Sequence, residues 1–131
     1  MKHNHREIFY QVWCKHLSKQ PLKAFEKEVL AVLVEYPEYV ENMTEQGISV
    51  SGGRNPYIVL GAHMALNDQI KLDRPQGIRA IYSEGVRAYG HERTKQLVLE
   101  VLIGMLESSY SYGEAPSEAA YLGAIDKVLA K

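Results

Sequence analysis

Apolar residues recur along most of this chain at the spacing of an α-helix, and this period restricts the possible folds more than any other feature. A stripe with this spacing predicts a helix over residues 4–18, and its inward face consists of Ile8, Phe9, Val12, Trp13 and Leu17. A second helix, predicted over residues 21–36, has the widest apolar surface, made of Leu22, Phe25, Val29, Leu30, Val32, Leu33 and Val34. We expect both stripes to face a core.

Prolines divide the remaining helical pattern into segments. Pro21, Pro56 and Pro116 occupy positions typical of a first helical residue, and Asn55 is a suitable N-cap for the helix after it. The predicted elements are a short helical turn over 37–43, helices over 56–70, 75–89 and 91–110, and a last helix from Pro116. Residues 44–54 lack the period and contain two adjacent glycines, which indicates a loop with room for a short extended piece. The pattern predicts an all-α fold: one compact domain over residues 1–131, a bundle of five or six helices with one longer loop near 44–54.

The size and composition of the chain agree with a globular protein that needs no covalent cross-link. Its 131 residues suffice for one domain, and 46% of them are apolar. Cys14 is the only cysteine, so no intrachain disulfide can form and a reducing compartment is expected. The longest apolar run, Val29–Val34, is far shorter than the roughly 20 residues that span a bilayer. With no signal-peptide pattern at the N-terminus, we expect a cytoplasmic protein without a membrane partner.

The charge balance argues against a nucleic-acid partner. The chain has 15 lysines and arginines against 16 acidic residues, and the basic residues are scattered along it. Proteins that bind nucleic acid usually gather basic side chains into a patch, because phosphate contacts supply much of their affinity.

Five residues are candidates for a binding pocket. His63 lies mid-helix among apolar neighbours, one turn from Asn67, and could be a ligand or base; the alternative is a core histidine with a structural hydrogen bond. His91 at a helix start is expected to be neutral and able to ligate, or else to be an ordinary surface histidine. Glu100 is half a helical revolution out of phase with His91, so a shared ion would need ligands from other helices. Glu38 follows Pro37 and is either a ligand or a solvated helix-end carboxylate.

Two further motifs predict less chemistry. Ser51-Gly52-Gly53-Arg54 precedes a helix, as in anion sites, but it lacks the ending of a phosphate-binding loop and favours a flexible turn. Cys14 has no cysteine partner in a redox motif, and we interpret it as an inert thiol.

One run of residues resembles a known family. The run includes Asn55-Pro56-Tyr57, His63-Met64-Ala65-Leu66, Gln69 and Asp73-Arg74-Pro75-Gln76-Gly77-Ile78-Arg79. With shorter matches at Pro37-Glu38-Tyr39, Glu100-Val101-Leu102, Pro116 and Tyr121-Leu122, it is similar to the bacterial domain-of-unknown-function family 1841, which consists of short helical proteins without an established activity.

The resemblance also implies something about metal binding. Typical members have histidine where this chain has Tyr36, Val40, Val59 and Lys95. A histidine set of that kind would suit a transition metal. Only His63 and His91 of that set remain here, along with Glu38 and Glu100, so we expect no bound metal and no cofactor.

Two functions follow as hypotheses. The first is a non-catalytic helical interaction or scaffold protein, whose partner is a second copy of the chain or another protein. The alternative is a metal- or small-molecule-binding bundle, or an enzyme, centred on His63 and His91 with Glu38, Glu100 and Asn67. Any metal would be held by the two histidines and two glutamates. No catalytic residue can be assigned.

Overall fold

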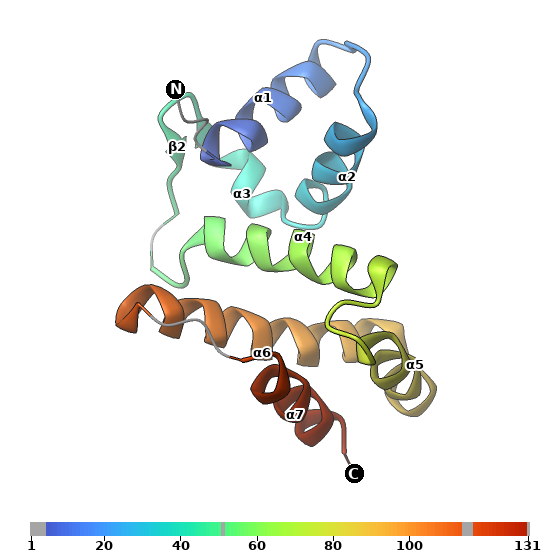
Figure 1. Ribbon diagram of the computed structural model, residues 1–131. Coiled ribbons are helices and arrows are strands. Elements are labelled where there is room, and N and C mark those ends of the chain that lie inside the picture. The colour runs from blue at the N-terminus through green and yellow to red at the C-terminus, as the bar shows by residue number, and fades with distance from the viewer. Residues whose placement is uncertain (1–4, 51, 114–116, 131) are drawn as a thin grey trace. The chain divides into compact units, whose positions relative to one another are not determined.

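A computed structural model describes residues 5–50, 52–113 and 117–130. Within these ranges the chain forms seven α-helices and one two-stranded ladder (Figure 1). The elements are α1 (His5–Leu17), α2 (Ala24–Leu33), α3 (Pro37–Glu41), β1 (Met43–Thr44), β2 (Gly47–Ile48), α4 (Pro56–Leu72), α5 (Ile78–Tyr89), α6 (His91–Tyr112) and α7 (Glu118–Leu129). The all-α prediction is confirmed. No helix among the described residues is both long enough and apolar enough to cross a bilayer.

The chain divides into two compact units, Met1–Leu60 and Gly61–Lys131. The boundary falls inside α4, so this helix contributes its first turn to the first unit and the rest to the second. We describe each unit by itself. The expectation of one domain over the whole chain stays a prediction.

The first unit is built on the contact between α1 and α2, with α3 against α2 and β2 against α1. Its buried apolar side chains are Phe9, Val12, Val29, Val32, Leu33, Tyr39, Val59 and Leu60. Three residues that the helical period placed in the core are exposed instead, namely Leu17, Phe25 and Val34. They lie at or just beyond the ends of their helices, where fewer neighbouring side chains are available to cover them.

The start of α2 differs from the prediction. The helix begins at Ala24, so Pro21 lies in the preceding loop and is not its first residue. The carboxylate of Glu26 accepts a hydrogen bond of 2.9 Å from the backbone N–H of Lys23. A carboxylate three residues into a helix stabilises the helix start in this way because the first N–H groups have no partner in the helix.

The segment predicted as a loop contains the short ladder of β1 and β2, in which Met43 pairs with Ile48 and Thr44 with Gly47. The Tyr57 hydroxyl accepts a hydrogen bond of 2.9 Å from the Ile48 N–H and fixes this ladder to the start of α4. Gly47 has a φ of +129°, and a β-carbon there would lie 2.8 Å from that hydroxyl oxygen. Only glycine meets both conditions.

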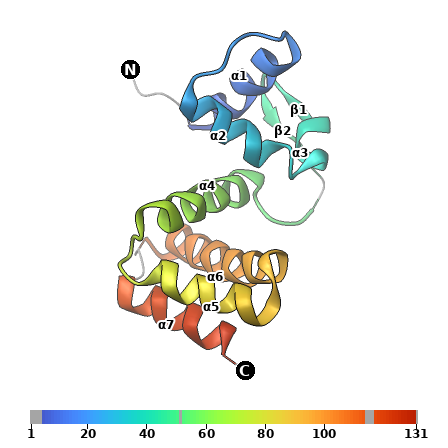
Figure 2. The same ribbon diagram turned by 90° about the vertical axis from the view of Figure 1, so that its right-hand side faces the viewer.

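In the second unit, α5, α6 and α7 pack against one another (Figure 2). Gly85 of α5 permits a close approach, since a β-carbon there would lie 2.9 Å from Cγ2 of Thr94 and 3.0 Å from Cδ1 of Leu129. The predicted opening of the last helix at Pro116 lies outside the described residues, and α7 begins at Glu118 with the Ser117 hydroxyl as its N-cap.

Two side chains lock the corner between α4 and α5. Asp73 Oδ1 accepts hydrogen bonds from the N–H groups of Gly77 and Arg79, at 3.2 and 3.0 Å. In return, Arg79 donates from Nε to the Ile70 carbonyl at 3.0 Å and from Nη2 to the Lys71 carbonyl at 2.7 Å. The aspartate thus satisfies the start of α5, and the arginine satisfies the end of α4.

Replacing Asp73 tests this corner. Asp73→Ala removes the acceptor and places alanine at a φ of +52°, a left-handed conformation that alanine rarely adopts. We expect the free energy of unfolding to fall by about 1–3 kcal/mol, the usual cost of a lost cap with added backbone strain. Asp73→Asn, which keeps an acceptor and tolerates this conformation, should lose much less. Urea denaturation measures both variants, and equal losses would contradict the role assigned to the side-chain oxygen.

Candidate functional site

The five residues predicted to form a pocket differ in their exposure. His63 on α4 is buried, with 2% of its surface exposed, and its helix neighbours Val59, Ala62 and Leu66 are buried too. His91, Asn67, Glu38 and Glu100 are exposed. The His91 ring meets the ring of Tyr82 edge-on, with centroids 6.2 Å apart. His63 therefore has the environment of a core residue, and His91 that of a helix-end surface residue.

The five residues are divided between the two units. Glu38 belongs to the first unit and the other four to the second. No group of three or more histidine, cysteine, aspartate or glutamate residues able to hold a metal ion occurs in the described parts of the chain. None of the five lines any of the three cavities described below. Their shared pocket stays a prediction.

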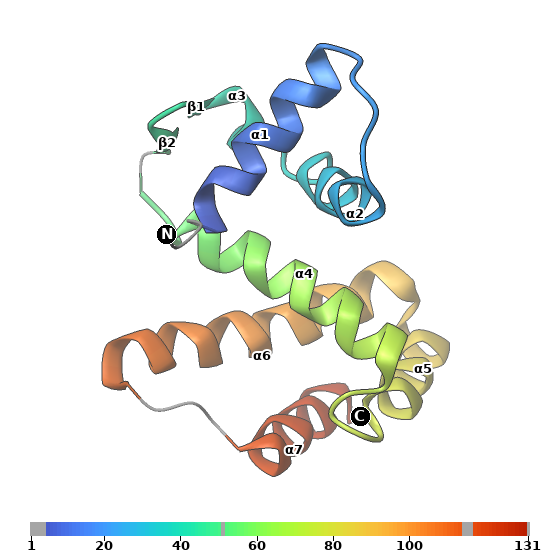
Figure 3. The same ribbon diagram turned by 45° about the horizontal axis from the view of Figure 1, so that its top comes forward.

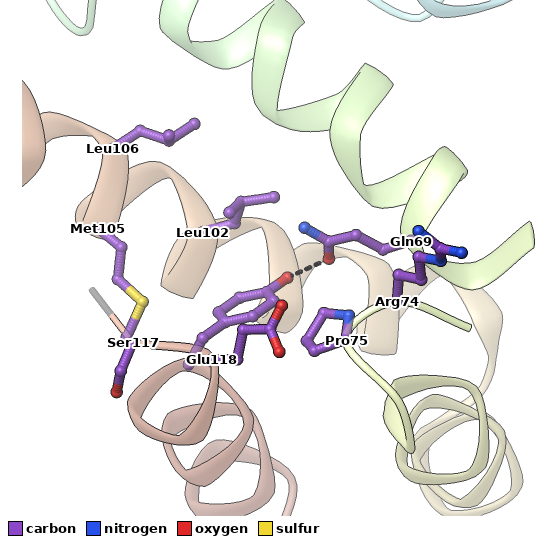
Figure 4. Close-up of a pocket in the computed structure, with 9 residues that line it drawn as sticks. Gln69, Arg74, Pro75, Leu102, Met105, Leu106, Ser117 and Glu118 are labelled. Carbon is purple, nitrogen blue, oxygen red and sulfur yellow. Dashed lines mark hydrogen bonds between the residues drawn. The ribbon is translucent and has the colours of Figure 1, made fainter. Parts of the chain in front are cut away.

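A cavity of about 300 Å³ lies in the second unit, where α4, α6 and α7 meet. Leu102, Met105 and Leu106 form one side of it, and Gln69 and Pro75 face them (Figure 4). The remaining lining residues are Arg74, Ser117, Glu118 and Tyr121. The walls are mainly apolar, so a small apolar group would fit.

The polar groups of this cavity mostly have structural roles. The Tyr121 hydroxyl donates a hydrogen bond of 2.6 Å to Oε1 of Gln69, the dashed line in Figure 4. Burial raises the pKa of Tyr121 to about 12, so its hydroxyl stays neutral at physiological pH. The Ser117 hydroxyl accepts the N–H of Ala120 as the cap of α7. The Tyr121 and Ser117 hydroxyls thus both take part in hydrogen bonds that hold helices in place.

Two other cavities, each of about 420 Å³, lie in the first unit. One is lined by α1 residues including Glu7 and Tyr10, by residues 43–47 and by Tyr57. The other borders the glycine-containing loop predicted as a flexible turn; of that loop, Ser51 lies outside the described residues. Asn55 acts as the predicted N-cap, since its Oδ1 accepts the Tyr57 N–H at 2.9 Å.

The segment with the most distinctive surface chemistry joins α1 to α2. We call residues 15–27 the basic turn: the end of α1, the loop over 18–23 and the start of α2 (Figure 3). It contains four lysines and a single acidic residue, Glu26. Two large apolar side chains on either side of the loop are more than half exposed, Leu17 at 64% and Phe25 at 54%.

Glu26 holds the basic turn together. Its Oε2 accepts a hydrogen bond of 2.7 Å from Nζ of Lys15 on α1, and its Oε1 accepts the Lys23 N–H at the start of α2. The side-chain hydrogen bond from Lys15, followed by the backbone hydrogen bond from Lys23, lowers the pKa of the Glu26 carboxyl below its ordinary value of 4.5. This carboxylate is therefore charged at neutral pH and connects the two helices.

The end of α1 is closed by a pair of backbone hydrogen bonds. The Gln20 N–H donates to the Lys15 carbonyl at 2.9 Å, and the Lys19 N–H donates to the His16 carbonyl at 3.1 Å. This is the Schellman pattern, which needs a left-handed residue and usually has glycine there. Here Lys19 takes that position, with a φ of +58°.

A family comparison identifies the chain. The family model for the domain of unknown function DUF1841 matches residues 1–127. The chain belongs to the DUF1841 family. No curated protein and no solved structure matches it.

The structure gives a physical role to part of the sequence that resembles the DUF1841 family. Asp73 and Arg79 lock the α4–α5 corner, Asn55 caps α4, and Gln69 binds the Tyr121 hydroxyl. These contacts stabilise helix ends and helix packing.

Sequence reasoning missed the basic turn as a surface feature. The helical period assigned Leu17 and Phe25 to the core, and the lysines appeared balanced because Glu26 and Glu28 lie next to Lys27. A lysine at every fourth position from Lys15 to Lys27 was the available signal. This spacing becomes informative only together with the structure, in which Glu26 binds Lys15 and the Lys23 N–H.

The low pKa of Glu26 predicts how stability depends on pH. A carboxyl whose pKa is lower in the folded chain stabilises that chain above its unfolded pKa, and this contribution is lost as the pH falls through the folded pKa. We expect the natural chain to be more stable than Glu26→Gln at pH 7, and the difference to shrink steadily below about pH 4.

Urea denaturation from pH 7 to pH 2 measures this difference. Glu41→Gln, which changes an exposed carboxylate at the end of α3, serves as the matched control and should not reproduce the effect. A stability difference between the natural chain and Glu26→Gln that stays constant over this pH range would contradict the hydrogen bonds assigned to the carboxylate.

Proposed function

We propose that this protein is a non-catalytic helical interaction domain that works in the bacterial cytoplasm without a cofactor. The supporting observation is the exposure of Leu17 and Phe25 on the basic turn. Burying a large apolar side chain contributes about 1.5–3 kcal/mol, so two such residues left exposed offer substantial free energy to a partner. Aromatic residues are also enriched among the residues that dominate binding at protein interfaces.

The basic turn is suited to binding because its backbone is held in place before any partner arrives. The Lys15–Glu26 hydrogen bond connects its two helix ends, and the Schellman pattern fixes the start of its loop. A surface ordered in advance loses less conformational entropy on association than a flexible one. The cytoplasmic location is supported by the single cysteine, and the bacterial origin by the family resemblance.

The alternative, a metal- or small-molecule-binding bundle centred on His63 and His91, has one observation in its favour, the burial of the His63 imidazole. A buried titratable group is a frequent feature of functional sites. The other four candidate residues are exposed, which argues against a buried binding site: His91, Glu38, Glu100 and Asn67. Elemental analysis of the purified protein separates the two functions, because a full equivalent of zinc, iron or manganese would support the alternative.

Photocrosslinking in cells tests the interaction proposal. With Phe25 replaced by p-benzoylphenylalanine, we expect a small number of discrete covalent protein adducts. Tyr110, an exposed aromatic residue of the second unit, is the matched control position and should give few or none. Adding Leu17→Ser to the position-25 probe should reduce the adducts at least about fivefold, since an exposed leucine contributes about 1 kcal/mol or more when a partner covers it.

A matched substitution keeps the result specific. Leu72→Ser changes an equally exposed leucine at the end of α4, in the second unit, and should leave the adducts at position 25 intact. No adduct at position 25, or adducts insensitive to Leu17→Ser, would contradict an interaction through the basic turn.

A further inference from the structure

We propose that the partner which covers the basic turn is a different protein, because the same turn of a second copy would bring lysines against lysines, and that it contributes an acidic segment with apolar side chains. This inference rests on the proposed function and specifies the chemistry of its partner. It follows from the charge left on the turn, from the conformation of Lys19, and from the position of the exposed apolar residues.

The turn has a net positive charge, since its four lysines outnumber its one acidic residue. Glu26 is its only carboxylate, and both of its oxygens accept hydrogen bonds inside the turn, from Lys15 Nζ and from the Lys23 N–H. Lys19, Lys23 and Lys27 are exposed, and none of them forms a salt bridge with an acidic side chain in the described parts of the chain. Three lysine charges are thus available to an acidic surface.

Lys19 has a backbone conformation that is unfavourable for a lysine. Its φ of +58° is a conformation that glycine adopts freely and that a side chain with a β-carbon disfavours. Glycine would close α1 with the same pair of hydrogen bonds and less strain. An ordinary residue held in this conformation suggests a role for its side chain beyond the fold. The side chain of Lys19 supplies a positive charge.

The apolar residues favour a protein over nucleic acid, and the small number of lysines favours a protein over an anionic membrane. Leu17 and Phe25 lie on either side of the lysine-bearing loop, so a partner must cover apolar and basic groups together. Binding to nucleic acid depends mainly on phosphate contacts, and anionic membranes usually attract clusters of about four to eight basic residues. The turn has three available lysines and two apolar side chains, a combination that fits an acidic amphipathic segment of a protein.

The experiment combines adduct mapping with charge variants of the full chain. Proteins captured by the probe at position 25 are digested, and the crosslinked segment is identified by mass spectrometry. We expect a segment from another protein with clustered Asp and Glu near apolar residues. The triple variant Lys19→Gln, Lys23→Gln, Lys27→Gln should lower the adduct yield at least about threefold, because each of three exposed charge pairs contributes a factor of about 1.4 to 5. The triple change to arginine, which keeps the charges, should lower it much less.

Lys19→Gly separates a binding role from a structural one. This variant relieves the backbone at position 19 while removing its charge, so we expect a higher melting temperature together with a lower adduct yield. A lysine needed only for folding would not give these opposite changes.

The outcomes are distinguishable from failure of the proposed function. No adduct at position 25 overturns both proposals. Two results overturn only the proposal of an acidic partner. The first is adducts that depend on Leu17 but persist in the glutamine triple variant, and the second is adducts that map to a segment without clustered acidic residues. An adduct with a second copy of this chain, with RNA or with lipid also overturns the acidic-partner proposal. Of these three results, only an adduct with a second copy would leave the proposed protein-interaction function standing.

Discussion

The turn between α1 and α2 depends on one carboxylate, that of Glu26. It accepts one hydrogen bond from Lys15 of α1 and one from the N–H of Lys23, so it joins two helices and stabilises the start of the second. The only negative charge of the turn between them is therefore engaged in these two contacts. A charged acceptor makes stronger hydrogen bonds than a neutral one, and here two donors share it. The lysines that remain, and the apolar residues beside them, are presented on a backbone that this carboxylate holds in place.

The second unit uses the same principle at its own helix ends. Asp73 satisfies the start of α5 and Arg79 the end of α4, so the corner is fixed by polar side chains at the surface, outside the apolar core. These residues belong to the most specific part of the resemblance to the DUF1841 family. The physical roles of Asn55, Gln69, Asp73 and Arg79 are structural. In this chain, the motif therefore contributes to the fold.

The helices could be predicted from the sequence because a 3.6-residue apolar period is a direct consequence of burying one helix face. The ends of these helices could not. Pro21 suggested a helix start, but the helix begins at Ala24, where the Glu26 carboxylate accepts the Lys23 N–H and also binds a lysine from another helix. Leu17, Phe25 and Val34 fit the inward stripes, yet periodicity does not tell how far a neighbouring element extends to cover the last turn.

The candidate site was predictable only in part. The apolar neighbours of His63 left open a ligand or a core histidine, and the side chain is buried. Which of His91, Glu38, Glu100 and Asn67 would approach it depends on tertiary packing, which spacing along one chain does not encode. The basic turn could not be recognised from the sequence, because counting charges along the chain does not show that Glu26 already binds Lys15 and the Lys23 N–H.

Glu26 and Lys15 stabilise the turn through one shared contact, and a double-mutant cycle tests this coupling most directly. Lys15→Met keeps the apolar stem of the lysine, and Glu26→Gln keeps the shape of the glutamate. Measured by urea denaturation at pH 7, the double variant should lose clearly less stability than the sum of the two single variants, because either change alone breaks the same contact. Losses that simply add would show that the two side chains act independently and would contradict this account of the turn.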